Sequence, residues 1–193
     1  EFAGNMIVGS TQSGVNIITS TAGTRPMIVA DIRSPAVYLK DLVAASESSR
    51  GTKTESRRIF STEPVPLDLL RSMDIKAAIT AGRVHGYTGK EILQDFNLGV
   101  SLEDGLLRVD PLTLQYAGGS VSMNFSVNAR VRAPVFKLRL TSEDMDLSTL
   151  QDYFDKPQYL KGELSATADL HGQGNSAHEI ASSLSGDAEF AIE

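Results

Sequence analysis

The chain contains no cysteine, which excludes disulfide bonds, thiolate metal sites and a cysteine nucleophile together. Only three histidines are present, His85, His171 and His178, and none has the spacing of a metal-binding motif such as HExxH. The net charge is −6 and no basic stripe is visible, which argues against a nucleic-acid partner.

Long apolar runs are also missing. No segment approaches the roughly 18 to 20 consecutive apolar residues that a membrane-spanning helix needs. No basic stretch precedes an apolar one in the way that marks a signal peptide. We therefore expect these 193 residues to be a piece of a longer protein whose targeting or anchoring segment lies elsewhere.

What the sequence does contain is alternation of apolar and polar residues. In residues 119–132 one set of alternate positions reads Val, Met, Phe, Val, Ala, Val and the other reads Ser, Asn, Ser, Asn, Arg, Arg. This pattern is typical of a β-strand with one buried and one solvated face. It recurs in residues 75–81, 96–102, 107–116, 136–140, 164–170 and 188–192, separated by short turn sequences. The sequence therefore predicts a mainly β fold, a long twisted antiparallel meander sheet.

Two or three short helices are expected beside the sheet. Ser148-x-x-Gln151 and Ser176-x-x-Glu179 are capping-box patterns, each of which predicts a helix start. The second helix should stop at Gly186, and a third short helix is expected near residue 66, where proline suits the first helical position.

The chain also repeats itself. Residues 26–42 align on residues 134–150 without a gap, and a proline, a serine and two leucines coincide. A strand–turn–strand–helix unit used twice indicates an array rather than a closed globule. Residues 46–61 have no apolar period and are typical of a solvated loop. We therefore predict that residues 1–45 end an upstream β repeat, residues 46–63 form a flexible connector and residues 64–193 form a second β module.

A search for catalytic chemistry finds no candidate. No Gly-x-Ser-x-Gly elbow is present, and Gly172-x-Gly174 is better explained as a tight strand-to-helix turn than as a phosphate cradle. The acidic residues Glu143, Asp144 and Asp146 lack the spacing of a calcium loop, and the charge preference of a helix N-terminus explains them more simply. We predict no enzyme, no cofactor and no metal site.

The apolar face of the strands is then the remaining candidate site. It is either a closed core, covered by helices or a second sheet, or an open groove. The long, numerous strands and the few short helices favour the groove. From alternation alone the predicted groove residues are Phe96, Leu98, Val100, Leu114, Tyr116, Met123, Phe125, Val127, Phe136 and Leu138.

Three segments resemble the AsmA family in the family's own order. Residues 60–77, which include Pro64 and Asp74, resemble its F-S-x-x-P-[LIV]-x-L-x-x-L segment and the D-[LIV]-x-[LIV] strand that follows. Residues 102–121 are similar to its L-x-[DN]-G-x-L…P-[LF]…G-G pattern, and residues 160–186 are similar to its L-x-G…L-x-G-x-G-x-S…L-x-G block. The upstream copy matches less specifically, with Lys40 where the later copy has Ser148.

The resemblance implies more than the residues do. Residues 64–193 would be the family's C-terminal β-groove module, of the repeating-β-groove type, in the periplasm and tethered to the inner membrane by a segment outside this chain. The implied partner is a phospholipid or another acyl-chain lipid, carried without catalysis for outer-membrane biogenesis. The alternative is a structural or assembly module of the cell envelope, which docks neighbouring repeats or envelope proteins without carrying lipid.

Overall fold

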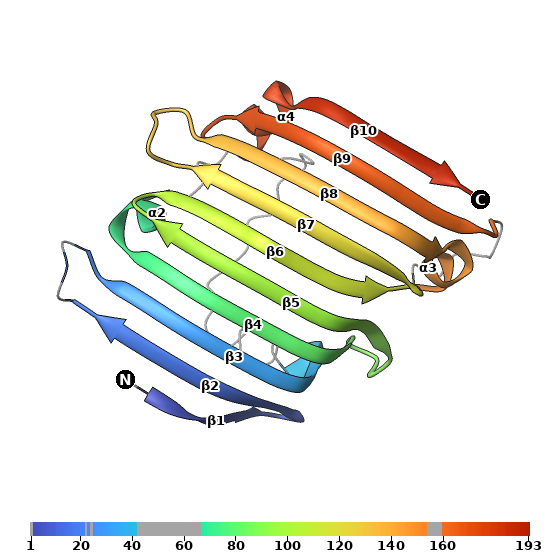
Figure 1. The fold of residues 1–193 in the computed structure, drawn as a ribbon, viewed down its shortest axis with the longest axis horizontal. Coiled ribbons are helices and arrows are strands. Elements are labelled where there is room, and N and C mark those ends of the chain that lie inside the picture. Colours follow the sequence, from blue (N-terminus) through green and yellow to red (C-terminus); the bar gives the residue numbers. More distant parts are fainter. Residues whose placement is uncertain (1, 22, 24, 42–66, 154–159) are drawn as a thin grey trace.

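The computed structural model describes residues 2–21, 23, 25–41, 67–153 and 160–193. These residues form one ten-stranded sheet whose strands lie side by side in chain order (Figure 1). The strands are β1 (Phe2–Val8), β2 (Thr11–Ser20), β3 (Met27–Tyr38), β4 (Asp74–His85), β5 (Glu91–Glu103), β6 (Leu106–Tyr116), β7 (Gly119–Asn128), β8 (Val135–Asp146), β9 (Glu163–Gln173) and β10 (Ser185–Ile192). The predicted mainly β meander is confirmed.

One pair of neighbours departs from the antiparallel pattern. Strands β3 and β4 are parallel, with Met27 opposite Asp74 and Tyr38 opposite His85. The chain must therefore return along the full length of β3 before β4 begins. Parallel pairing requires such a crossover of a dozen or more residues, and the connection between Tyr38 and Asp74 is long enough to provide it. The predicted connector, residues 46–63, lies outside the described residues.

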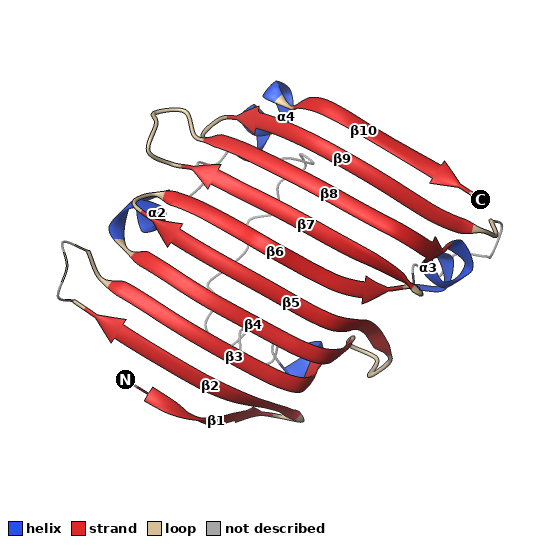
Figure 2. Cartoon of the chain, viewed as in Figure 1, coloured by secondary structure: helices blue, strands red, loops and turns tan. Residues whose placement is uncertain are grey.

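Helices α2 (Asp68–Ser72), α3 (Leu147–Tyr153) and α4 (Ala177–Ser183) lie at the ends of the strands, and residues 39–41, directly after β3, are also helical (Figure 2). Helices α2 and α4 lie at the end where β5 and β9 finish, and α3 lies at the opposite end, where β8 finishes. None of them is long, so most of the sheet is not covered by the described helices.

The caps of these helices correct two predictions. At α4 the predicted capping box is present: the Ser176 hydroxyl accepts from the Glu179 backbone amide at 3.2 Å, and the Glu179 carboxylate accepts from the Asn175 amide at 2.7 Å. The helix ends at Ser183 rather than at Gly186, because β10 already begins at Ser185.

Ser148 does not cap α3 as the sequence predicted. That helix begins at Leu147, and the Asp146 carboxylate accepts from the Thr149 amide at 2.6 Å, which lowers the pKa of Asp146. A carboxylate beside the free amides of a helix start suits the helix dipole. Asp146 is therefore the capping residue.

Strand register gives the sheet two faces of opposite character. Because directly paired residues share a face, a row of paired residues shows what that face is made of. One row runs Val15, Ile32, Ile79, Leu98, Leu112, Met123, Leu140, Ala168, Ala188 from β2 to β10. A row on the opposite face runs Lys76, Ser101, Arg108, Ser126, Lys137, His171, Ser185 from β4 to β10. We call these the apolar face and the outer face.

The two aligned segments of the predicted repeat have the same local structure, although β3 pairs in parallel with β4 and β8 antiparallel with β9. The aligned segments are β3, followed by helical residues 39–41, and β8, followed by α3. The coincident serines, Ser34 and Ser142, are 6% and 3% exposed. Each serine lies beside a register shift. The Ser34 hydroxyl donates to the Gln12 carbonyl at 2.6 Å, and the Ser142 hydroxyl donates to the Ala166 carbonyl at 3.5 Å. The shared serine therefore satisfies a backbone carbonyl where the ladder is interrupted.

Candidate functional site

All ten predicted groove residues lie on the apolar face. Leu98 pairs with Leu112, whose alternate neighbours on β6 are Leu114 and Tyr116. On the next strands Phe125 pairs with Leu138, and Val127 pairs with Phe136. The structure therefore brings the ten side chains together across β5 to β8, and their role in lipid binding stays a prediction.

At the α2 end the protein itself covers part of this face. Leu67, just before α2, is 7% exposed and packs with Val127 and Ala129, which are 4% and 0% exposed. Leu70 and the partly buried Leu107, Phe125 and Phe136 complete this cluster. On the neighbouring strand, Ile180 of α4 lies against Gly172. The predicted groove residues Phe125, Val127 and Phe136 therefore contribute to a small core here.

At the opposite end the apolar face encloses a hollow. Its volume is about 370 Å³, and residues of β1, β2, β3, β4 and β5 all line it. On a flat sheet β1 and β5 would lie about 19 Å apart, at about 4.8 Å per strand. Met6 of β1 and Phe96 of β5 line the same hollow, so the sheet is strongly curled with its apolar face inside. We call this concave apolar face the trough and the cavity within it the hollow.

The hollow has an almost purely hydrocarbon lining. Apart from Thr11, Ser13, Ser34 and Thr80, its residues are apolar: Met6, Val8, Ile32, Val37, Leu39, Ile79, Ala81, Val84, Leu93 and Phe96. The Ser34 hydroxyl donates to backbone carbonyls and the Thr11 hydroxyl accepts from the Tyr38 amide at 2.9 Å, so both are occupied within the protein. The hollow therefore offers a ligand hydrophobic contact and few hydrogen-bonding groups.

The sequence prediction included Phe96 but missed the rest of the hollow. For Leu93 and Val84 the reason is visible at the strand irregularities, whereas Ile79 and Ala81 follow the apolar alternation of residues 75–81. Leu93 and Phe96 both face the hollow although three positions separate them, because the register shifts between Gln94 and Asn97 and Asp95 has a positive φ of 48°. The same three-residue step separates Ala81 from Val84 on β4. Strict alternation assigns one member of each pair to the wrong face.

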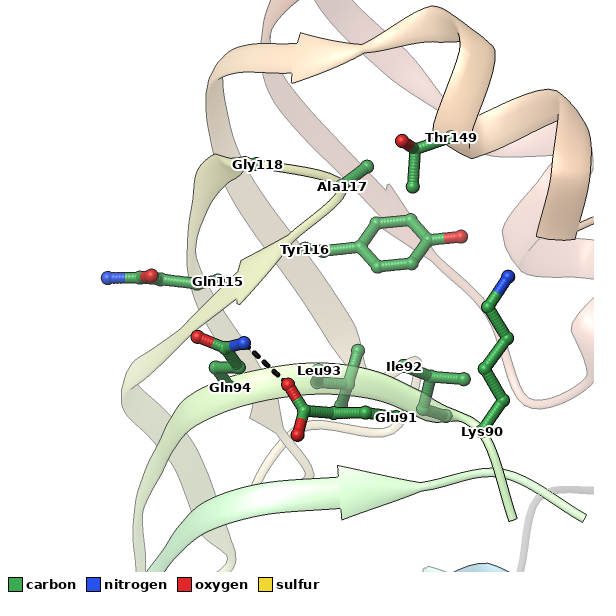
Figure 3. Close-up of a pocket in the computed structure, with 10 residues that line it drawn as sticks. All are labelled: Lys90, Glu91, Ile92, Leu93, Gln94, Gln115, Tyr116, Ala117, Gly118 and Thr149. Carbon is green, nitrogen blue, oxygen red and sulfur yellow. Dashed lines mark hydrogen bonds between the residues drawn. The ribbon is translucent and has the colours of Figure 1, made fainter.

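A second, polar pocket adjoins the hollow. It has a volume of about 220 Å³ and is lined by residues from the start of β5, the end of β6 and Thr149 of α3 (Figure 3). Leu93 lines both cavities. In Figure 3 the side chains of Lys90, Tyr116 and Thr149 gather on one side of the pocket, and those of Gln94 and Gln115 extend toward the other. The Glu91 carboxylate accepts a hydrogen bond from the Gln94 amide.

The outer face has the chemistry of a solvated surface. Arg139 donates to the Asp169 carboxylate at 2.6 Å, and this hydrogen bond holds the pKa of Asp169 below its ordinary value. Arg33 does the same to Asp31 on β3, at 2.8 Å. Both pairs are exposed, so they add little to the stability of the fold, and they make this face polar and accessible to solvent.

Two of the three histidines contact neighbouring side chains. The His85 ring stacks on Tyr38 with 4.5 Å between ring centroids, and the His171 Nε2 atom lies 3.0 Å from the Ser185 hydroxyl. In the described ranges no three His, Asp or Glu side chains converge as a metal site would require. Within the same ranges no helix combines the length and the hydrophobicity that crossing a membrane would take.

Comparison with known proteins agrees with the family resemblance. The sequence profile of the AsmA family matches residues 2–193. The chain is also similar to AsmA family protein YhjG of Escherichia coli (strain K12), with 20% identity over 201 aligned residues that cover 96% of this chain. The chain spans 29% of that protein's length. No solved structure matches it significantly. Since the profile covers nearly the whole chain, this protein belongs to the AsmA family.

Proposed function

We propose that this chain is a non-catalytic lipid-binding module that holds phospholipid acyl chains in its trough. Membership of the AsmA family points to a role in the cell envelope, and the trough suggests which role. The observation that carries the proposal is the uninterrupted row of paired apolar residues from β2 to β10, which leads past a hollow of about 370 Å³ with a nearly pure hydrocarbon lining. In its natural setting the module would act in the periplasm, tethered to the inner membrane, during outer-membrane biogenesis.

Hydrophobic burial alone supplies enough affinity for such a ligand. Each methylene removed from water contributes about 0.8 kcal/mol, so a tail needs no specific contact to bind a trough of this kind. An apolar face without bound tails would leave its side chains exposed to water over several strands, which soluble surfaces rarely tolerate. A lipid would cover them.

The direct test is native mass spectrometry of the chain, purified gently and without detergent from a bacterial host. We expect adducts with the masses of phospholipids, released on delipidation and restored by adding lipid. Protein that is lipid-free after gentle purification, and that takes up no phospholipid from vesicles, would contradict the proposal.

A second candidate function is docking of another envelope protein or repeat without lipid. The observation in its favour is β10, whose eight residues are all exposed, with Phe190 at 78% and Ile192 at 52%. An open edge strand can pair with another strand. Concentration-dependent dimers of lipid-free protein, detected by analytical ultracentrifugation, would favour this alternative over lipid binding.

A further inference from the structure

The polar pocket and the hollow together have the shape and chemistry of an amphiphile site. They adjoin at Leu93, which lines both. One is a hydrocarbon chamber, and the other is lined by the Lys90 ammonium, the Glu91 carboxylate, two side-chain amides and the side chains of Tyr116 and Thr149. We propose that Lys90 binds the phosphate of a phospholipid or lysophospholipid, one tail of which passes Leu93 into the hollow. This inference rests on the proposed function, because it names one site within the trough.

Charge supports a phosphate rather than a neutral head. Lys90 forms no ion pair with any residue that the structure describes, although seven such pairs join other charged groups. The nearest acid in sequence, Glu91, is held by the Gln94 amide and extends to the opposite side of the pocket (Figure 3). The Lys90 ammonium is therefore available to an anionic oxygen, and a charge-assisted hydrogen bond is the stronger kind.

Thr149 forms part of the pocket wall above Tyr116 (Figure 3). Asp146 accepts from the Thr149 amide and fixes the first turn of α3, so Thr149 lies over the end of β6 next to Tyr116. Lys90 precedes the first residue of β5, whose pairing with β4 begins at Glu91 opposite His85. Elements distant in sequence thus bring a cation and an aromatic wall to one pocket.

The size of the hollow limits the tail. An apolar cavity of about 150 Å³ accommodates benzene, so about 370 Å³ accommodates on the order of a dozen carbon atoms. That corresponds to one lauroyl-length tail or the end of a longer one. Two tails would not fit in this chamber, and the second tail of a diacyl lipid would lie along the open trough.

The test compares ligands that separate head from tail. Isothermal titration calorimetry of the delipidated chain would use lauroyl lysophosphatidylglycerol, monolauroylglycerol and inorganic phosphate, below micelle-forming concentrations. We expect the lysophospholipid to bind about tenfold more tightly than monolauroylglycerol, as one charge-assisted hydrogen bond allows, and phosphate alone not to bind measurably.

Variants assign the effect to Lys90. Lys90→Gln should lower the affinity for the lysophospholipid to that for monolauroylglycerol and leave the latter unchanged. Lys137→Gln is the matched control, since Lys137 is an exposed lysine on the outer face of β8. Both variants alter exposed side chains, and a thermal melt checks that each still folds.

The outcomes are distinct. Equal affinities for the two amphiphiles in the wild-type chain, equal losses in the two lysine variants, or tight binding of phosphate alone would each overturn this inference while leaving tail binding intact. If neither amphiphile binds, the proposed lipid-binding function itself is wrong, and this site falls with it.

Discussion

Leu98→Asp is the substitution that tests the trough most sharply. Leu98 lies midway along the apolar row, paired with Ile79 and Leu112, and it is only partly buried. A carboxylate there would remove contact with the tail over about one strand spacing, about 4.8 Å or roughly four methylenes. At about 0.8 kcal/mol per methylene the loss is about 3 kcal/mol, or roughly a hundredfold in affinity. We expect the amount of bound phospholipid to fall accordingly.

The matched control is Asn97→Asp. It adds the same charge at the next position of β5, where the side chain is exposed on the outer face opposite Thr113. We expect it to leave lipid binding unchanged. The assay is the phospholipid bound per chain, by native mass spectrometry, beside a urea unfolding curve for each variant.

Stability separates an open trough from a closed core. Because Leu98 is only partly buried, we expect Leu98→Asp to reduce the free energy of unfolding by about 1 kcal/mol, a fraction of the 1.5 to 3 kcal/mol for a fully buried leucine. Outright unfolding would mean that the face is sealed. Unchanged lipid binding in Leu98→Asp, or an equal loss in Asn97→Asp, would refute the assignment of this face. Phe125→Asp is a poorer test, because Phe125 packs against the core cluster and its replacement would destabilise the fold directly.

Three further predictions concern the fold. The Leu102 side chain is only 2% exposed. Leu102→Ala should therefore lower the free energy of unfolding, measured by urea titration, by about 2 to 5 kcal/mol. A loss below about 1 kcal/mol would contradict the place of Leu102 in the core. Ser176→Ala should lower the free energy of unfolding by about 1 kcal/mol in the same assay, because it removes the hydroxyl that accepts from the Glu179 amide. An unchanged midpoint of the urea unfolding curve would show that this cap adds no stability. The hydrogen bond from Arg139 lowers the pKa of Asp169 below 3.8 in the folded chain. The ionised carboxylate therefore stabilises the fold at pH values above 3.8. This stabilisation is lost as the pH falls through the lower pKa of the folded state. Asp169→Asn should therefore lose less stability than the wild type when thermal melts at pH 6 and pH 2 are compared, and equal losses would contradict the ion pair's role.

The sequence by itself determined the two faces of the sheet, the strand segments from β4 to β10, the repeat and the capping box at Ser176, although β7 ends at Asn128 and not at residue 132 as predicted. Each is a local property, because side chains alternate with a period of two along any strand and a cap involves neighbours within one turn. The ten predicted groove residues share one face for this reason.

Tertiary structure decided what that face encloses. The parallel pairing of β3 with β4, the cover that Leu67 provides over Val127, and the curl that brings Met6 near Phe96 all depend on contacts between residues distant in sequence. Register shifts then move residues such as Leu93 across faces, because one extra residue in a strand reverses the alternation beyond it. Period-two alternation contains no information about where such a shift falls, so the hollow and the pocket of Lys90 became visible only in the folded chain.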